Sequence, residues 1–286
     1  MEFKFEPKVR VNVPVIVSNI IKSDVSSFEI NQNKLCNMIF AYFAMNYHLI
    51  DSSDIMSINN QTLQFTLTQE NHDRFSALCD TVSITNKAQF FRVILFNYCN
   101  YPRYLRERII FSSSLKIIEE GIKARRKIKI RYRNEYRIIE PYFIIKSDGE
   151  TRNYIFTYCE KRQSYCNYRL SNIHAVGVSV NALLEHYDSE YIKQIKNSFD
   201  AFLSFGHRVK VRFDDVGEEM YRQNLTHRPK LLAQQENVFE FECSALKAQL
   251  YFPQFMHHAE ILEPEDLRAW FKEKFNKVAT LYNQNN

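Results

Sequence analysis

Arginine and tyrosine residues are interspersed through residues 127–180, and these two residue types can bind an anion together. A guanidinium group binds phosphate through two parallel hydrogen bonds. A tyrosine ring offers a flat face on which an unpaired base can stack. Because stacking tolerates any base, a single-stranded nucleic acid would fit with little sequence preference. A plainer explanation stays open, since tyrosines at alternate positions also favour strands and pack against one another.

Short strands must position these side chains. Residues 127–133 alternate between basic and apolar types, which predicts a strand with one buried face. Four further strands are predicted at 137–145, 153–159, 165–170 and 173–180, with turn residues at 134–135, 147–150 and 161–163 between them. Five strands with no helical pattern among them predict a small SH3-like or Sm-like β-barrel.

This stretch resembles the WYL domain in the order and spacing of four motifs. They are Ile128-Lys129-Ile130-Arg131-Tyr132, Arg137 with Glu140-Pro141-Tyr142, Asn153-Tyr154-Ile155, and Tyr168-Arg169-Leu170 with Ile173. Two positions depart from the family pattern. Asn153 replaces the name-giving Trp, and Asn172 stands where many members carry a second Arg.

The resemblance implies a pocket for an anionic ligand, often a nucleic acid. The residues at the pocket positions are Tyr132, Arg137, Tyr142, Tyr154, Tyr168 and Arg169. The match to the motif favours a binding role for the two arginines over a solvated one. Tyr165 and the Lys161-Arg162 turn would extend a basic rim, although such a turn is commonly just solvated.

The first hundred residues contain a weak internal repeat of a strand, a short helix and a longer helix. The first copy is predicted at 8–13, 15–25 and 31–47, and the second at 63–68, 69–82 and 86–98, where Thr85 is the expected N-cap. This order resembles the ribbon-helix-helix family, in which paired strands enter the DNA major groove. A helix-turn-helix is the competing interpretation.

On such a ribbon, alternate polar residues face outward. They are Arg10 and Asn12 in the first strand and Gln64, Thr66 and Thr68 in the second. Arg can read guanine edges, and Asn or Gln can read adenine edges. The alternative is that these side chains are only the solvated side of a two-stranded sheet.

The predicted fold class is α+β, with five segments along the chain. They are a tandem ribbon-helix-helix-like domain at 1–101, a basic linker helix within 102–126, the WYL domain at 127–182, a connecting helix within 183–207, and a ferredoxin-like domain at 208–286. The last has the order β-α-β-β-α-β-α. It resembles the extension that follows many WYL domains, which implies a homodimer because such extensions often exchange between subunits.

Composition excludes several classes of protein. The 286 residues carry a net charge of +5, which permits a nucleic-acid partner without requiring one. There is no apolar run long enough for a membrane span, no apolar secretory segment, no phosphate-binding glycine loop and no paired metal-ligand motif. We therefore expect a cytoplasmic protein that is not an enzyme and has no metal or cofactor, with its six cysteines reduced.

Three functions remain open. The pairing of a ribbon-helix-helix module with a WYL domain resembles accessory proteins of type VI-D CRISPR-Cas systems. That resemblance implies binding of single-stranded RNA (or single-stranded DNA) and stimulation of an RNA-guided RNase effector. The alternative is a transcriptional regulator that binds duplex DNA through the ribbon and senses a nucleotide or oligonucleotide with the barrel. The third is an interaction protein whose Arg/Tyr surface binds an acidic protein.

Overall fold

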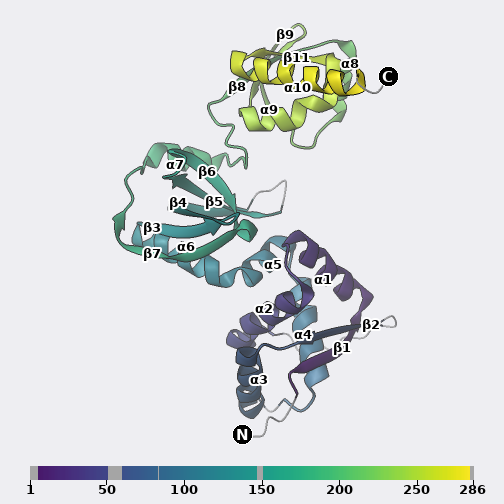
Figure 1. The fold of residues 1–286 in the computed structure, drawn as a ribbon, viewed down its shortest axis with the longest axis vertical. Coiled ribbons are helices and arrows are strands. Elements are labelled where there is room, and N and C mark those ends of the chain that lie inside the picture. The colour runs from purple at the N-terminus through teal and green to yellow at the C-terminus, as the bar shows by residue number, and fades with distance from the viewer. Residues whose placement is uncertain (1–5, 51–59, 83, 147–150, 284–286) are drawn as a thin grey trace. The chain divides into compact units, whose positions relative to one another are not determined.

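A computed structural model describes residues 6–50, 60–82, 84–146 and 151–283 (Figure 1). The turn expected at 147–150 lies outside these residues. The chain divides into two compact units, Met1–His186 and Tyr187–Asn286. Both units combine helices with antiparallel sheets, so the fold is α+β.

The N-terminal part of the first unit contains the expected order of a strand and two helices, and this order occurs twice. It comprises β1 (Lys8–Pro14), α1 (Val15–Ser27), α2 (Gln32–Met45) and a short 3-10 turn (Tyr47–Leu49), followed by β2 (Asn60–Thr66), α3 (Gln69–Val82) and α4 (Lys87–Asn100). β1 and β2 pair antiparallel, from Lys8 opposite Thr66 to Pro14 opposite Asn60. The cap of α4 is Asn86 and not Thr85, because the Asn86 side chain accepts a hydrogen bond from the backbone N–H of Gln89 at 3.0 Å.

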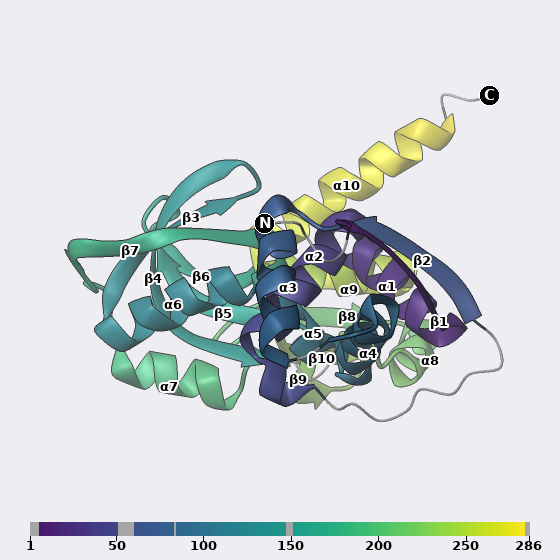
Figure 2. The same ribbon diagram turned by 90° about the horizontal axis from the view of Figure 1, so that it is seen from below.

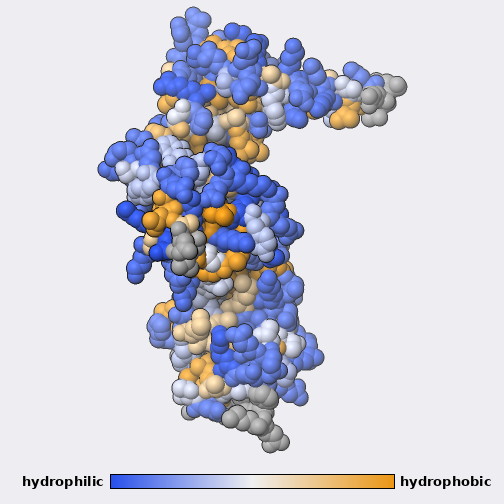
Figure 3. Space-filling model, turned by 60° about the vertical axis from the view of Figure 1, so that its left-hand side comes forward, coloured by the Kyte–Doolittle hydropathy of each residue, from blue (hydrophilic) through white to orange (hydrophobic). Residues whose placement is uncertain are grey.

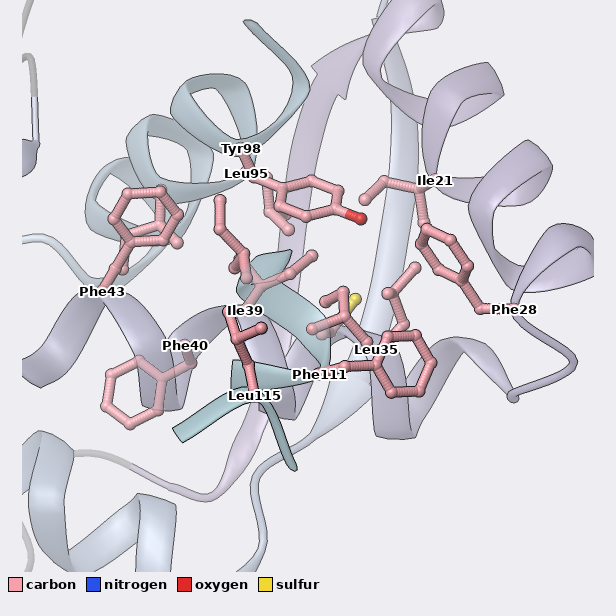
Figure 4. Close-up of a cluster of buried hydrophobic side chains, with 14 of the residues drawn as sticks. Ile21, Phe28, Leu35, Ile39, Phe40, Phe43, Leu95, Tyr98, Phe111 and Leu115 are labelled. Carbon is pink, nitrogen blue, oxygen red and sulfur yellow. The ribbon is translucent and has the colours of Figure 1, made fainter. Parts of the chain in front are cut away.

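One face of this two-stranded ribbon is buried. Val9, Val11 and Val13 of β1 are buried together with Leu63 and Phe65 of β2, and the residues between them are exposed. The helices close over these apolar side chains and form a dense core of aliphatic and aromatic residues (Figure 4). The alternating pattern in the sequence is therefore the cause of the buried face.

Two helices occupy the segment 102–126, where we expected one linker helix. They are α5 (Arg103–Ile110) and α6 (Ser112–Ala124), and Phe111 separates them. Phe111 is buried and packs edge-to-face on Phe28 at a ring distance of 5.7 Å (Figure 4). A single straight helix would carry Phe111 past this contact, so burial of the ring explains the break.

Five strands follow α6 and form one antiparallel sheet. They are β3 (Arg126–Tyr132), β4 (Glu135–Lys146), β5 (Asn153–Cys159), β6 (Ser164–Arg169) and β7 (Ile173–Leu183), in the order β6-β5-β4-β3-β7. The expected closed barrel is not present among the described residues, because β6 and β7 remain edges. Leu170–Asn172 form a 3-10 turn between them, and β7 then pairs with β3 instead of β6.

Helix α6 packs against β3, β4 and β7 (Figure 2). Gly121 allows this close approach, because a Cβ atom there would clash with the side chain of Ile128. Residues of α6 and of the sheet belong to the same continuous apolar core as the N-terminal helices. The first unit is thus held together by one core and not by two.

The expected connecting helix within 183–207 is shorter than predicted. β7 runs on to Leu183, and α7 covers only Ser189–Asn197. The side chain of Asp188 caps α7 by accepting hydrogen bonds from the backbone N–H groups of Glu190 and Tyr191 at 3.1 and 3.0 Å. This cap fixes the first residue of the helix.

The second unit contains a four-stranded antiparallel sheet in the order β11-β8-β10-β9. Its elements are α7, β8 (Arg208–Phe213), α8 (Asp215–Gln223), β9 (Lys230–Gln235), β10 (Val238–Glu242), α9 (Ala245–Tyr251), a 3-10 turn (Phe252–His258), β11 (Ala259–Glu263) and α10 (Glu265–Asn283). Val209, Val211 and Phe213 of β8 are buried in its core. The residues between them form ion pairs with glutamates, as Arg212 does with Glu260.

No helix in the described part of the chain has both the length and the apolar character needed to cross a lipid bilayer. The face shown in Figure 3 is mostly hydrophilic, with smaller hydrophobic patches between the polar side chains.

Candidate nucleic-acid interface

The six predicted pocket residues are divided between the two faces of the five-stranded sheet. In the pairing of β5 with β6, Tyr154 lies opposite Arg169 and Ile155 lies opposite Tyr168. Successive residues of a strand point to opposite faces. Tyr168 therefore lies on the face that joins the apolar core, and Arg169 lies on the other face.

Arg137 lies between two tyrosine rings on the core-side face. Its guanidinium carbon is 5.1 Å from the ring centre of Tyr132 and 5.8 Å from that of Tyr168. The two rings are 4.8 Å apart and tilted by 59°. The Nη1 atom of Arg137 also donates a hydrogen bond to the hydroxyl of Tyr168 at 3.1 Å. Three of the predicted residues thus form one cluster, which we call the Arg137 cluster.

One hydrogen-bonding group of Arg137 is not used. The Nε atom is buried and has no acceptor among the described residues, whereas Nη2 donates to Glu135 at 3.1 Å. Burial lowers the pKa of Arg137, but the hydrogen bonds to Tyr168 and Glu135 raise it, and the net pKa lies above its ordinary value. The group is a permanent cation that still lacks one acceptor.

Two residues that the sequence did not single out complete this cluster. The guanidinium of Arg133 lies 5.5 Å from the ring centre of Tyr132, on the β3–β4 turn. Glu135 binds both Arg137 and Lys161, the latter at 2.9 Å. The alternation of cations and rings along Arg133, Tyr132, Arg137 and Tyr168 suits a ligand with phosphates and bases. The alternating basic pattern of β3 was the available signal for Arg133.

Arg169 and Tyr154 form a second pair on the opposite face. The Nε atom of Arg169 donates to the Tyr154 hydroxyl at 3.2 Å. Tyr154 is buried, and Arg169 is partly exposed. The two predicted arginines therefore cannot grip one phosphate together from the same side of the sheet.

Tyr142 is part of a buried ionic network instead. Its hydroxyl donates to Glu140 at 3.1 Å and to the backbone carbonyl of His186 at 2.9 Å. Glu140 is fully buried and also accepts hydrogen bonds from the backbone N–H groups of Glu185 and His186 at 3.1 and 2.9 Å. Lys127 lies beside it, with Nζ 3.7 Å from the carboxylate. These contacts give Tyr142 a structural role.

Asn153, which replaces the family's Trp, is 1% exposed and fixes α5 to the sheet. Its backbone N–H and its side-chain amide both donate to Oε2 of Glu107, at 2.8 and 2.7 Å. The amide also donates to the carbonyl of Tyr104 at 2.7 Å. The other oxygen of Glu107 accepts from the backbone N–H of Ser171 at 3.1 Å. The sequence did not point to Glu107. The only hint was Asn153 in place of the motif Trp, because a buried amide needs a polar partner.

Four of the five candidate ribbon residues are exposed on the outer face of β1 and β2, and the fifth, Thr68, lies beyond the end of β2. The four are Arg10, Asn12, Gln64 and Thr66. Arg10 lies opposite Gln64 in the strand pairing. The backbone carbonyl of Asn12 accepts a hydrogen bond from Arg92 at 2.7 Å, which ties this strand to α4.

No group of three or more His, Cys, Asp or Glu side chains within the described ranges could hold a metal ion. His258, half of the His257-His258 pair, instead lies 2.8 Å from a carboxylate oxygen of Asp214. None of the six cysteines forms a disulfide bond within the described residues, and all six are buried.

Comparison with known proteins gives a domain family and a fold. Residues 113–178 match the family model of the WYL domain, and the match begins in α6. The crystal structure of a CRISPR Cas-related protein is similar to this chain with a TM-score of 0.68 and 18% sequence identity, over 98% of this chain and 95% of that one.

Proteasome accessory factor B/C (PafBC) of Arthrobacter aurescens is 13% identical over 94% of this chain and 49% of that one, with a TM-score of only 0.29. No curated protein matches the sequence. The chain therefore shares its fold with the CRISPR Cas-related protein, and its residues 113–178 are a WYL domain.

Proposed function

We propose that this chain is a nucleic-acid-binding regulatory protein that binds single-stranded RNA through its WYL domain and stimulates an RNA-guided RNase of a type VI-D CRISPR system. The observation that carries the proposal is Arg137, a cation between two tyrosine rings whose buried Nε lacks an acceptor. A phosphate oxygen would supply that acceptor, and an unpaired base would stack beside the rings. The likeness to a CRISPR Cas-related protein supports the choice of pathway.

The proposed action is regulatory and not enzymatic. It requires only that bound RNA changes how the chain engages the RNase. We also propose a ribbon-helix-helix assignment for the N-terminal module and a ferredoxin-like assignment for the second unit. The antiparallel pairing of β1 with β2 supports the first, and the strand order β11-β8-β10-β9 supports the second. A homodimer formed through the second unit is part of this proposal, and light scattering on the purified chain measures it directly.

Fluorescence anisotropy with a labelled single-stranded RNA, single-stranded DNA and duplex DNA of one sequence tests the proposal. We expect tight binding of the single strands that weakens steeply as salt rises, because phosphate contacts release counterions. Arg137→Gln should weaken single-strand binding by on the order of tenfold and leave the fold intact. Unchanged affinity in a folded Arg137→Gln protein would overturn the assignment of this cluster.

A second experiment tests whether the chain stimulates the RNase. Cleavage of a reporter RNA by a type VI-D RNase is measured with and without the chain. The wild-type chain should raise the rate, and Arg137→Gln should raise it less. If both proteins raise it equally, stimulation does not depend on RNA bound at this cluster.

A transcriptional regulator is the second candidate function, and the exposed Arg10–Gln64 pair on the ribbon favours it. These side chains match those that read guanine and adenine edges. Arg10→Ala with Gln64→Ala should abolish sequence-specific duplex binding under this hypothesis, with single-strand binding unchanged. The Arg137 variant and the ribbon variant therefore serve as controls for each other.

A further inference from the structure

An open cavity of about 320 Å³ lies inside the first unit, between the N-terminal helices and the β3–β4 turn. Lys34 of α2, Arg131 and Arg133 beside the turn, and His174 of β7 line it, together with Glu29. Arg133 also lies beside Tyr132 at the edge of the Arg137 cluster, whereas the other four residues belong neither to that cluster nor to the ribbon. The cavity thus adjoins the Arg137 cluster but has its own lining.

Its charge is positive and not internally neutralised. Lys34, Arg131 and Arg133 are three permanent cations against the single carboxylate of Glu29. Throughout the described ranges, none of the three cations forms an ion pair. Surface cations on this chain commonly do form one, as Arg212 does with Glu260 and Arg208 with Glu240. The cavity is therefore a concentrated positive potential.

His174 lies close to two of these cations. Arg131 and His174 lie directly opposite each other in the pairing of β3 with β7. Partial burial, followed by the charges of Arg131 and Lys34, holds the pKa of His174 below its ordinary value. The imidazole is therefore neutral at pH 7 and can donate one hydrogen bond without adding charge.

Two of the cations occupy positions that do not favour folding. Lys34 lies in the first turn of α2, where its backbone N–H donates to the N-cap Asn31, and a cation there opposes the helix dipole. Arg133 has a φ of 47°, in the left-handed region that suits glycine or asparagine. Because stability does not explain these two charges, a ligand is the better explanation.

We propose that this cavity binds the phosphate group of a nucleotide-sized ligand. Arg131 and Arg133 would donate to the phosphate oxygens, and Lys34 would add a third positive charge. The volume lies near the lower end of the roughly 300–1,000 Å³ found for small-molecule sites, which suits one nucleotide and not a folded partner. The ligand would contact the N-terminal module through Lys34 and the WYL domain through Arg131. The inference does not depend on RNA binding at the Arg137 cluster.

Isothermal titration calorimetry of the full chain with adenosine 5′-monophosphate and with inorganic phosphate tests the site. We expect both to bind, the nucleotide more tightly. Arg131→Gln and Lys34→Gln should each weaken binding by on the order of tenfold. Lys129→Gln is the matched control, because Lys129 is an exposed cation two residues before Arg131 on the same face of β3 and does not line the cavity.

Arg133→Asn separates binding from folding. Asparagine suits the left-handed turn better than arginine, so this variant should unfold at an equal or higher temperature while the nucleotide binds more weakly. In an NMR titration, bound phosphate should also raise the pKa of His174, because an anion stabilises the protonated ring.

Several results would overturn the inference. One is equal nucleotide affinity in the wild type and in a folded Arg131→Gln, Lys34→Gln double variant. Another is a His174 pKa that does not respond to the nucleotide. A third is loss of single-stranded RNA binding in the double variant without any nucleotide binding by the wild type, which would assign the cations to a nucleic-acid backbone. Arg137→Gln should leave nucleotide binding unchanged, so failure of the RNA proposal and failure of this one are distinguishable.

Discussion

Arg137 donates a hydrogen bond to the hydroxyl of Tyr168 on one face of the sheet. Arg169, which follows Tyr168 in β6, donates to Tyr154 on the other face. The two arginines that the family resemblance assigns to one pocket therefore lie on opposite faces of the sheet. Each arginine has its own tyrosine partner. This arrangement changes what mutations at the two positions should do.

The two arginines should act independently on single-stranded RNA. Arg137→Gln and Arg169→Gln are expected to have additive effects on the binding free energy, because the side chains share no partner across the sheet. A double-mutant cycle measured by anisotropy should give a coupling energy below about 0.5 kcal/mol. A much larger coupling would mean that both side chains reach the same phosphate.

Tyr168→Phe should destabilise the first unit. It removes the acceptor for Nη1 of Arg137, a cation whose Nε already lacks one. We expect a loss of about 1–3 kcal/mol in the free energy of unfolding, measured by urea denaturation. Tyr132→Phe is the control, since it keeps the ring beside Arg137. Equal stability of wild type and Tyr168→Phe would show that water replaces the hydroxyl at no cost.

Restoring the family's Trp at position 153 should be harmful here. Asn153→Trp would remove the side-chain hydrogen bonds to the buried Glu107 carboxylate and to the Tyr104 carbonyl, and the larger indole would push α5 away from the backbone N–H that also donates to Glu107. A buried carboxylate that loses donors costs about 1–3 kcal/mol or more. Thermal unfolding of the variant should therefore occur at a lower temperature. An unchanged midpoint would contradict the role given to this contact.

Acid should lower the stability of the folded protein through protonation of Glu140. Hydrogen bonds from His186, Glu185 and Tyr142 outweigh the effect of burial and hold the pKa of Glu140 below its ordinary value of 4.5. The unfolded chain therefore takes up the proton first, so this contribution to stability is complete above about pH 4.5 and is lost as the pH falls through the folded value. The free energies of unfolding of the wild type and of Glu140→Gln, measured by denaturation at a series of pH values, should become equal at low pH. Parallel pH dependence in the two proteins would locate the effect elsewhere.

Thiol reagents should leave the native protein unmodified. All six cysteines are buried, and burial raises the pKa of Cys36, Cys99 and Cys243 to about 12. Thiolates are the reactive form, so DTNB at pH 8 should release colour only on addition of denaturant. Rapid reaction of one thiol in the native protein would reveal local opening around it.

Local patterns in the sequence predicted much of the fold, because the forces involved act between near neighbours. The alternation at 8–13 and at 127–133 gave strands, and 69–82 matched α3 at both ends. The errors arose from distant contacts. The helix break at Phe111 depends on the contact of this ring with Phe28. The sheet stays open because β7 pairs with β3 and not with β6.

The candidate site shows the same division. The family motif identified Arg137, Tyr132 and Tyr168, which the structure brings into one cluster. It also grouped Tyr142 with them, but the Tyr142 hydroxyl contacts the buried carboxylate of Glu140. The sequence could not show that burial, because the other partners of Glu140 are distant residues, among them Lys127 and His186. Glu107 was missed because its partner Asn153 comes 46 residues later in the sequence, beyond α6, β3 and β4.

The single core shared by the N-terminal helices and the WYL sheet has a consequence for protein engineering. Modules that touch only through a linker can be exchanged by cutting the linker. Here, any chimaera joined between residues 101 and 112 would carry Phe111 away from Phe28 or Glu107 away from Asn153. A new N-terminal module would have to bring its own side chains to fill both places, and grafts that ignore this should misfold as a whole.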